Sequence, residues 1–326
     1  MDATQLKLIE ALSDGRFHGG DDLGRAVGLS RAAVGKRLVR FADIGLRVDA
    51  VKGKGYKLSQ AIDLIDRQTV LDTMTSVIRS KIERLDLVPV TESTNQDAMA
   101  ATGTAGYRVV VSDYQTAARG RRGKRWEQGF ASSLTFSIAK DFNLELKHLS
   151  QMSLWTAVAV AEALDALYAA PVRVKWPNDI YVGGKKLAGI LLEARAEVGG
   201  TVRLVVGVGI NVSQQGLVGA AIDQPWISLS ELPQRTAVNR SQLLGRMVDG
   251  IVDALDSTES ASPDALRGRW QKFDMLLGQM VDVHSVTQTL TGECQGIDAD
   301  GNLSVLIDGR LHSLNAGEVT IRRATL

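Results

Sequence analysis

A twelve-residue stretch, residues 115–126, combines five basic side chains with two glycines and contains no acidic residue. Its basic residues are Arg119, Arg121, Arg122, Lys124 and Arg125. Glycine lets backbone pass close to a ligand, and clustered positive charge attracts an anion. Strand-like runs at 107–112 and 133–138 flank the stretch, which predicts an anion-binding loop on a rigid scaffold. The alternative is a solvated surface loop, with or without nucleic acid against it.

Lysine, carboxylate and amide side chains recur further along the chain, at the predicted ends or edges of strands. They are Lys175, Asn178, Asp179, Lys186 and Asn211. Two lysines and a carboxylate beside a basic glycine loop suit an acidic ligand that carries phosphates and binds together with Mg²⁺. Each residue alone is most often an ordinary surface residue, so the prediction rests on the cluster.

Three consecutive small polar residues, Ser93-Thr94-Asn95, follow a short strand predicted at 87–90. Thr94 or Asn95 could cap a helix that begins near Gln96, and the local pattern favours this interpretation. The alternative is that the three side chains hydrogen-bond a neutral polar ligand.

The strands that would position these residues are predicted at 172–176, 180–182, 185–193 and 201–211. The last three are predicted to form an antiparallel meander. Pro177 ends the first strand, and the pair Gly183-Gly184 is typical of a hairpin turn between the next two. Consecutive strands joined by short turns argue against a Rossmann domain.

Nucleotide-binding fingerprints are absent from the sequence. Gly207-Val-Gly209 is followed by Val212 where a dinucleotide fingerprint needs its third glycine, and no P-loop motif occurs. Any nucleotide must therefore be bound by individually placed side chains.

Helical patterns surround the meander. Residues 61–85 have the pattern of a helical connection, and a new domain is predicted to begin near residue 65. Apolar residues at helical spacing predict a long helix at 150–170. This helix carries Glu162 and Asp165, so we do not interpret it as membrane-spanning.

Length and composition limit the class of protein. A chain of 326 residues is too long for one ordinary core, so two or three domains are expected. The single cysteine, Cys294, excludes an internal disulfide framework and a cysteine-based zinc site. No signal peptide is recognisable at the N-terminus, and we expect a cytoplasmic protein.

The first sixty residues concentrate positive charge. Eight basic and two acidic side chains at 31–57 give a local charge of +6, against +1 for the whole chain. Short helices are predicted at 6–12, 22–27 and 31–40, the last capped by Ser30, and a hairpin with a basic Gly53-Lys54-Gly55 tip follows. The pattern predicts a winged helix-turn-helix, with the helix-turn-helix at about 20–39.

The residues predicted to contact DNA are Ser30, Arg31, Ala32, Lys36, Arg37, Lys52 and Lys54. Gly35 inside the predicted recognition helix is a mild objection, since glycine costs about 1 kcal/mol relative to alanine there. The alternative is a three-helix protein-interaction module with an ordinary charged face.

The C-terminal residues 275–326 are strand-rich. Asp300-Gly301 and Asp308-Gly309 are hairpin signals, and the pattern predicts a small β-barrel. The four histidines, at positions 18, 148, 284 and 312, fit neither a catalytic triad nor a metal site.

Taken together, these motifs resemble the biotin protein ligases, and more closely their bifunctional form that also represses biotin synthesis genes. The segments that carry the resemblance are residues 93–96, 119–126, 175–179, 186–191 and 207–211, with 30–33, 53–56 and 269–274 in support.

The resemblance implies an α+β multidomain fold. A winged helix-turn-helix would occupy residues 1–60, and a biotin- and ATP-binding domain residues 65–272. The latter would contain a mixed or antiparallel sheet with helices, similar to class II aminoacyl-tRNA synthetases. An SH3-like β-barrel would occupy 275–326.

The resemblance also implies the reaction. Biotin and ATP, with Mg²⁺, would give biotinyl-5′-AMP, and biotin would pass to a lysine of the biotin carboxyl carrier protein of acetyl-CoA carboxylase. The adenylate-bound protein would form a homodimer and bind operator DNA, with no membrane involved. Two other hypotheses stay open: a ligand-sensing repressor without catalysis, and a lipoate-type ligase.

The site residues follow from the same resemblance. Lys186, Arg121 and Asp179 would be catalytic, with Asp179 as a Mg²⁺ ligand or as the residue that orients the incoming lysine. The binding residues would be Ser93, Thr94, Asn95, Gln115, Arg119, Gly120, Arg121, Trp126, Lys175, Asn178, Lys186, Asn211, Trp226 and Arg322. The family loop commonly has glycine where this chain has Ala118, and a positive φ there would strain alanine.

Overall fold

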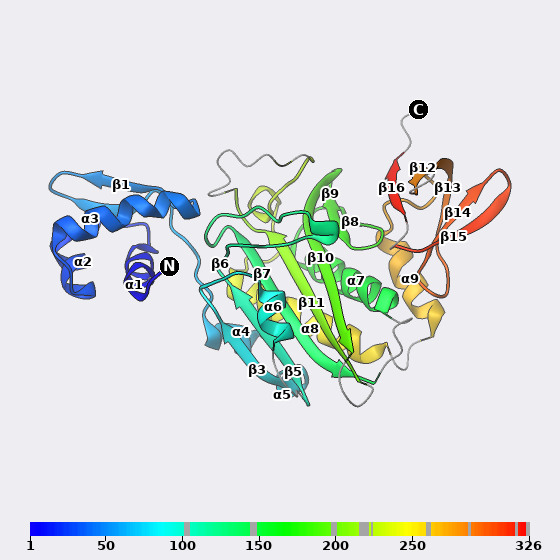
Figure 1. Ribbon diagram of the computed structural model, residues 1–326, viewed down its shortest axis with the longest axis horizontal. Helices are drawn as coiled ribbons and strands as arrows, with labels where there is room; N and C mark the ends of the chain where they lie inside the picture. Colours follow the sequence, from blue (N-terminus) through cyan, green and yellow to red (C-terminus); the bar gives the residue numbers. More distant parts are fainter. Residues whose placement is uncertain are drawn as a thin grey trace.

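The computed structural model of the chain describes residues 1–100, 105–143, 149–196, 201–214, 222, 224–258, 262–285, 288–316 and 319–323. Three parts lie in a row along its longest axis (Figure 1): the N-terminal helices at one end, a large sheet in the middle and a smaller sheet at the other end. No helix in the described ranges has the length and apolar character that a membrane crossing requires.

The N-terminal part contains three helices and a hairpin: α1 (Ala3–Leu12), α2 (Gly20–Val27), α3 (Arg31–Val39), β1 (Val48–Val51) and β2 (Gly55–Leu58), with the 3-10 turn η1 (Arg40–Ile44) before the hairpin. Helix α2 ends at Gly28, whose φ of 71° favours glycine. Ser30 caps α3, because its side chain accepts a hydrogen bond from the Ala33 N–H at 3.3 Å.

Gly35 has a packing role in α3. A Cβ atom at this position would lie 3.1 Å from the Tyr56 hydroxyl of β2, so glycine lets the hairpin approach the helix. Gly35 thus lowers the helix propensity of α3 but permits the close contact between this helix and the hairpin.

The central sheet has seven strands in the order β3-β5-β7-β11-β10-β9-β8. Their bounds are β3 (Ile82–Leu87), β5 (Tyr107–Ser112), β7 (Ser133–Phe142), β8 (Val172–Lys175), β9 (Asp179–Val182), β10 (Lys185–Ala196) and β11 (Val202–Asn211). β3 and β5 are parallel and the other pairs antiparallel, so the sheet is mixed. The predicted meander is confirmed as β9, β10 and β11, with positive φ at Gly183 and Gly184 in the turn.

Helices cover both faces of this sheet. α7 (Leu149–Leu167) and α8 (Arg240–Ser257) pack together on one face, with α4 (Arg67–Thr73), α5 (Ser76–Lys81) and α9 (Pro263–Phe273) beside them (Figure 1). The short helix α6 (Thr94–Met99) lies on the opposite face, where Ala98 is buried against β5, β7 and β11.

The predicted helical connection at 61–85 is only partly right. Residues 67–73 and 76–81 are helical, but β3 already begins at Ile82, five residues before the strand predicted at 87–90. β3 is an edge strand with Glu83 and Arg84 exposed. Charged side chains on a sheet edge remove the apolar alternation that identifies a strand.

The C-terminal sheet has the order β15-β14-β13-β12-β16. Its strands are β12 (Met280–His284), β13 (Thr289–Ile297), β14 (Leu303–Ile307), β15 (Arg310–Leu314) and β16 (Thr320–Arg323). Asp308 and Gly309, with φ of 48° and 74°, form the tight turn between β14 and β15. The sheet contacts the central part, since the Trp176 indole N–H donates to the Gly301 carbonyl at 3.1 Å.

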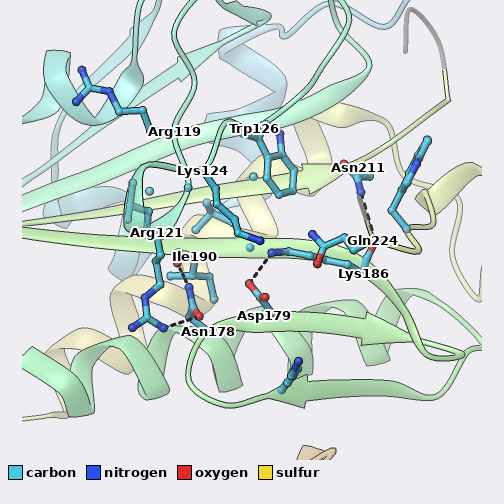
Figure 2. Close-up of a pocket in the computed structure, with 18 of the residues that line it drawn as sticks. Arg119, Arg121, Lys124, Trp126, Asn178, Asp179, Lys186, Ile190, Asn211 and Gln224 are labelled. Carbon is cyan, nitrogen blue, oxygen red and sulfur yellow. Dashed lines mark hydrogen bonds and ion pairs between the residues drawn. The ribbon is translucent and has the colours of Figure 1, made fainter. Parts of the chain in front are cut away.

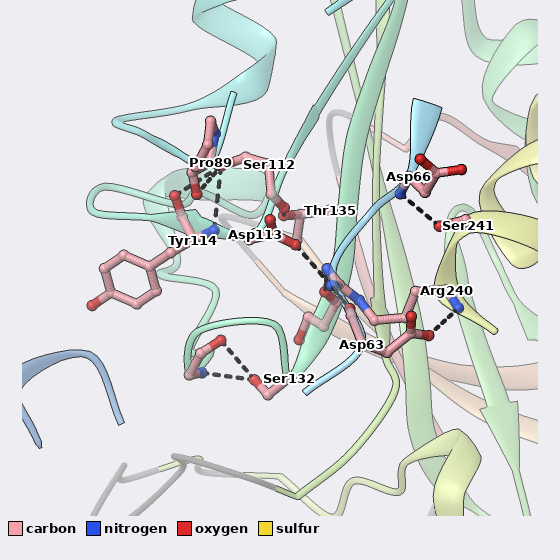
Figure 3. A network of polar contacts seen from close by, with 12 residues as sticks. Asp63, Asp66, Pro89, Ser112, Asp113, Tyr114, Ser132, Thr135, Arg240 and Ser241 are labelled. Atoms are coloured by element: carbon pink, nitrogen blue, oxygen red, sulfur yellow. Dashed lines mark hydrogen bonds and ion pairs between the residues drawn. The ribbon is translucent and has the colours of Figure 1, made fainter. Parts of the chain in front are cut away.

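The linker after β2 is fastened to the central sheet by a buried arginine (Figure 3). Arg240, the first residue of α8, is 2% exposed. Its Nη1 donates to Asp113 Oδ1 at 2.7 Å and its Nη2 to the Ser133 carbonyl at 2.9 Å. Its backbone N–H and Nη1 also donate to Asp63 of the linker. Nearby, the Phe130 N–H donates to the Ile44 carbonyl at 2.8 Å, which joins the N-terminal part to the central part.

Candidate active site

A cleft of about 970 Å³ opens over β9, β10 and β11 and is bordered by the loop 118–127 and by residues 319–321 of the C-terminal part. Figure 2 shows its central residues. The predicted site residues Ser93, Thr94, Asn95, Gln115, Arg119, Gly120, Arg121, Trp126, Lys175, Asn178, Asp179, Lys186, Asn211 and Trp226 all line it. Side chains from distant parts of the chain therefore meet in one place.

Glycines form the floor of the cleft. A Cβ atom at Gly209 would lie 2.9 Å from the Trp126 indole, and one at Gly189 would lie 3.4 Å from both Trp126 and Lys186. At Gly207 it would lie 2.1 Å from Asn95 Oδ1. The three glycines on β10 and β11 therefore leave room above the sheet for Trp126, Lys186 and Asn95.

Lys186 and Asp179 form an ion pair in the centre of the cleft, with 2.8 Å between Nζ and Oδ1 (Figure 2). Their side chains are 15% and 25% exposed. Lys186 Nζ also lies 6.0 Å from the centre of the Trp126 ring, within cation–π range. This half-buried ammonium is placed to neutralise an anionic group that enters the cleft.

The basic loop is fixed at one point by Arg121. Its Nη1 donates to Asn178 Oδ1 at 3.1 Å, and its Nη2 donates to the Ala316 carbonyl of the C-terminal part at 2.9 Å. Arg121 therefore joins the loop, the turn between β8 and β9, and the segment that follows β15. Arg119 lies on the same loop but is exposed, and its guanidinium points away from Lys186 in Figure 2.

Ala118 does not require glycine. Its φ is not among the positive values of the chain, and its side chain is buried. The Trp126 N–H donates to its carbonyl at 3.1 Å, so the loop closes on itself here. The expected strain at this departure from the family pattern is absent.

The predicted helix cap at residues 93–95 is wrong in detail. The N-cap of α6 is Ser93, and its side chain makes no capping hydrogen bond. Thr94 and Asn95 instead lie inside the helix and are buried, and their side chains turn to neighbouring strands. The Thr94 N–H donates to Gln115 Oε1 at 2.8 Å, which orients the Gln115 amide.

Asn211 and Trp226 border the cleft on the side of the segment 224–228. Asn211 Nδ2 donates to the carbonyls of Lys186 and Ile227 at 3.4 and 3.2 Å, so its amide holds the backbone beside Lys186. Trp226 is half-buried and pairs with Lys186 through an isolated β-bridge. These contacts make both residues supports for Lys186.

Lys175 lies at the end of β8, with its Nζ 5.9 Å from the centre of the Tyr181 ring. Burial, and then the nearby charge of Asp179, raise the pKa of Tyr181 to about 12. This phenol therefore keeps its proton at neutral pH. The backbone of Arg322 belongs to β16, but its side chain lies outside the part of the chain that the structure describes.

The residues predicted to contact DNA lie on α3 and the β1–β2 turn. Ser30, Arg31, Ala32, Lys36, Lys52 and Lys54 are exposed. Arg37 is half-buried and forms an ion pair with Asp2 at the start of α1, so part of its charge is already neutralised inside the protein.

A protein-built magnesium site does not fit the donor set around Asp179. No group of three or more histidine, cysteine or acidic residues that could hold a metal ion occurs among the described residues. Asp179 already forms an ion pair with the ammonium of Lys186. Mg²⁺ prefers several oxygen ligands, and among the described residues this site offers one carboxylate.

Sequence reasoning missed two polar residues and the role of the glycines. Ser137 of β7 and Glu193 of β10 both hydrogen-bond Asn95, yet each sits in an unremarkable strand pattern. The glycines did leave a signal, because Gly207 and Gly209 on one face of a strand interior indicate a close approach.

Comparisons with known proteins agree over the whole chain. Residues 86–211 match the biotin/lipoate A/B protein ligase family, and residues 276–322 match the biotin protein ligase C-terminal domain. The bifunctional ligase/repressor BirA of Salmonella typhimurium is 33% identical over 98% of each chain. The biotin–[acetyl-CoA-carboxylase] ligase of Mycobacterium tuberculosis is 30% identical over 72% of this chain and 88% of its own.

Among solved structures, the biotin protein ligase from Aquifex aeolicus in complex with biotin and ATP is 27% identical, with a TM-score of 0.63. It covers 74% of this chain and 100% of its own. The predicted ligase class is confirmed by these relatives. A relative 33% identical along nearly the full length shows that this chain belongs to the biotin protein ligase family.

Proposed function

We propose that the protein condenses biotin with ATP and transfers biotin to a lysine of the biotin carboxyl carrier protein of acetyl-CoA carboxylase. A biotin carboxylate oxygen attacks the α-phosphorus of ATP, pyrophosphate leaves, and biotinyl-5′-AMP forms. The carrier lysine amine then attacks the acyl carbon, AMP leaves, and an amide bond forms. Similarity to a ligase whose solved structure is a complex with biotin and ATP supports both substrates.

The Lys186–Asp179 pair in the cleft carries this proposal. The carboxylate and the α-phosphate are both anions, and Lys186 would neutralise them as they approach. Asp179 would hold Lys186 in position until substrate arrives and would then orient the incoming amine. Arg121 would close the loop over the reactive anhydride and exclude water.

The other cleft residues divide between the two ends of the ligand. Ser93, Thr94, Asn95 and Gln115 would surround the ureido ring, whose polar groups need partners when buried. Trp226 would pack on the adenine, and Lys175, Arg119 and Arg322 would face phosphates. Mg²⁺ would enter as part of the substrate MgATP.

ATP–pyrophosphate exchange with the purified chain tests the adenylation step. Exchange that depends on biotin would support the proposal. Exchange with lipoate but not biotin would indicate a lipoate-type ligase. Tight biotin binding without exchange would indicate a ligand-sensing repressor.

A second function, repression of biotin synthesis genes, is supported by the N-terminal part. A side-chain-capped α3 with exposed Arg31 and Lys36, beside a hairpin tip with exposed Lys52 and Lys54, suits a winged helix-turn-helix on DNA. We assign residues 1–60 to this domain, 65–272 to catalysis and 275–326 to an SH3-like barrel.

Binding to DNA upstream of biotin synthesis genes, with and without biotin and ATP, tests the repressor function. Tighter binding with both ligands, together with a shift from monomer to homodimer in sedimentation, is the expected result. Equal affinity for DNA with and without biotin and ATP would contradict a corepressor role for the adenylate.

A further inference from the structure

The C-terminal sheet joins the central part through a short turn that follows α9. Asp274 pairs with Val174 of β8 through an isolated parallel bridge, and the Met275 N–H donates to the Val174 carbonyl at 2.9 Å. The chain therefore adds to the central sheet at its edge strand β8. The Gly278 N–H then donates to the Cys294 carbonyl of β13 at 2.8 Å, so the same turn already contacts the C-terminal sheet.

The carboxylate of Asp274 holds this turn. Its Oδ1 accepts hydrogen bonds from the N–H groups of Leu276 and Leu277, at 2.8 and 3.3 Å. Its Oδ2 accepts one at 2.9 Å from the indole N–H of Trp270, which is 1% exposed and lies one turn earlier in α9. One carboxylate thus fixes both the end of α9 and the direction in which the chain leaves it. We refer to residues 270–279 as the joint.

Burial of this carboxylate is unfavourable in itself. Burial raises the pKa of Asp274, and hydrogen bonds from the three N–H groups oppose that effect. A charged group withdrawn from water is costly unless donors surround it, and all three donors belong to the joint. These hydrogen bonds therefore stabilise one particular geometry of the joint.

The joint determines where one border of the cleft lies. β12 begins at Met280, directly after the joint, and pairs with β16. Residues 319–321, at the start of β16, border the cleft, as does Leu276 of the joint itself. Because packed strands shift as a unit, a change in the joint would move β12, β16 and this border together.

This border lies at the opposite end of the cleft from α6. The sheet order places β8 at one edge of the central sheet, with β9 and β10 between it and β11. Thr94 and Asn95 belong to α6, which packs on β5, β7 and β11. A displaced C-terminal sheet would therefore alter the β8 end, where Lys175 lies, and would leave the α6 end as it is.

We propose that Asp274 is a positioning residue for the nucleotide: it holds the C-terminal sheet against β8 and so sets the width of that end of the cleft. The inference rests on the proposed function, which assigns the phosphates to Lys175 and Arg322, and deepens it through a residue outside the lining of the cleft. The hydrogen bond from the Trp176 indole to the Gly301 carbonyl is a second attachment of the C-terminal sheet. A change at Asp274 would therefore loosen the sheet without detaching it.

Calorimetry on the full chain gives the Kd of MgATP and the Kd of biotin separately. In Asp274→Asn, whichever way the amide turns, its NH₂ group faces at least one of the N–H donors of the joint. We expect the Kd of MgATP to rise about 10-fold, as when a buried donor loses its acceptor. The Kd of biotin should change less than about twofold, because its end of the cleft is distant.

Trp270→Phe removes the indole donor and provides a second background for the same change. In this background the new amide can turn its nitrogen toward the phenyl ring and its oxygen toward the Leu276 and Leu277 N–H groups. Asp274→Asn should then raise the Kd of MgATP only about twofold or less relative to Trp270→Phe alone. Equal effects of Asp274→Asn in both backgrounds would contradict the role given to this carboxylate.

Asp264→Asn is the matched control, because Asp264 is an exposed acid on the same helix, where it pairs with Arg267. It should leave both Kd values unchanged. A merely structural role of Asp274 would lower the fraction of chains that bind ligand, or raise both Kd values in parallel. Either result would overturn the inference.

ATP–pyrophosphate exchange measured on the same samples separates this inference from the proposed function. If the unaltered chain shows no biotin-dependent exchange, the proposed catalysis is contradicted. A selective rise in the Kd of MgATP in Asp274→Asn would still support the positioning role. A chain that binds no MgATP would contradict both.

Discussion

The two sides of the cleft, its floor of strands and the loop opposite, differ in structure. The floor consists of β10 and β11, whose backbones are paired along their length, and Gly189, Gly207 and Gly209 leave room for other side chains above it. The opposing loop 115–126 is rich in charged side chains. At its start, the Thr116 and Ala117 N–H groups donate to the carbonyls of Thr91 and Glu92, and further along Arg121 joins it to Asn178 and Ala316. We therefore propose that the sheet determines which ligand fits, whereas the loop determines how long a reactive intermediate stays in the cleft.

Lys186→Ala removes the cation that the floor presents to the ligand, and we expect the largest loss. Adenylation should fall about 10²- to 10³-fold with the fold intact, as when a group that stabilises developing charge is removed. Pyrophosphate exchange measures this. Lys185→Ala, an exposed neighbour on the same strand, is the control, and equal losses in both would break the assignment.

Gly209→Ala adds a methyl group to the floor of the cleft. The added Cβ would lie 2.9 Å from the Trp126 indole, so the indole must move and the ligand loses space. We expect the KM for biotin to rise about 10-fold or more, since overpacking typically costs about 1–3 kcal/mol. Gly268→Ala on α9 meets nothing within 4 Å and should leave KM unchanged.

Arg121→Gly opens the loop without changing the floor. Biotin should still be activated, but the adenylate should escape, and biotinylation of bystander proteins should rise several-fold relative to the carrier protein. Blotting for biotin on mixed proteins measures this. Arg125→Gly, whose side chain is exposed and pairs with Glu127, should retain selectivity. Unchanged selectivity in Arg121→Gly would remove that residue from closure.

Asp256 lies away from both the floor and the loop of the cleft. We expect it to affect the stability of the fold and not ligand binding. Burial opposes its charge, but hydrogen bonds from Lys81 and Tyr107 and the charge of Lys140 hold its pKa below the ordinary value. Its stabilisation is therefore present above pH 3.8, the ordinary value, and is lost as the pH falls through the lowered pKa.

Asp256→Asn should reduce the free energy of unfolding by about 1–3 kcal/mol at neutral pH and flatten its dependence on acid. Denaturant unfolding at several pH values measures both, and KM for biotin should not change. An altered KM would mean that the site and this distant contact are coupled.

Strands with alternating or continuous apolar residues could be predicted from the sequence, as could the glycine turns and the side-chain cap at Ser30. β3 was predicted too late because Glu83 and Arg84 give its exposed edge a polar pattern. The cleft residues were identified by type and motif, since lysine, arginine and amide groups at strand ends have few purely structural reasons to cluster.

The partners within the cleft could not be predicted. Glu193 and Asn95 are separated by 98 positions, and only the folded sheet shows that they touch. Thr94 and Asn95 have the composition of a helix cap, and tertiary hydrogen bonds to Gln115 and Ser137 override that local preference.

The contact between Phe130 and Ile44 has a consequence for modularity. Phe130 and Ala131 share a hydrophobic cluster with the N-terminal helices, and the next residue, Ser132, accepts hydrogen bonds from the Val212 and Ser213 N–H groups beside the cleft. Cutting the chain after residue 60 would uncover Phe130 to water. The N-terminal part therefore covers side chains of a segment that leads to the cleft, and we expect its removal to disturb that segment as well.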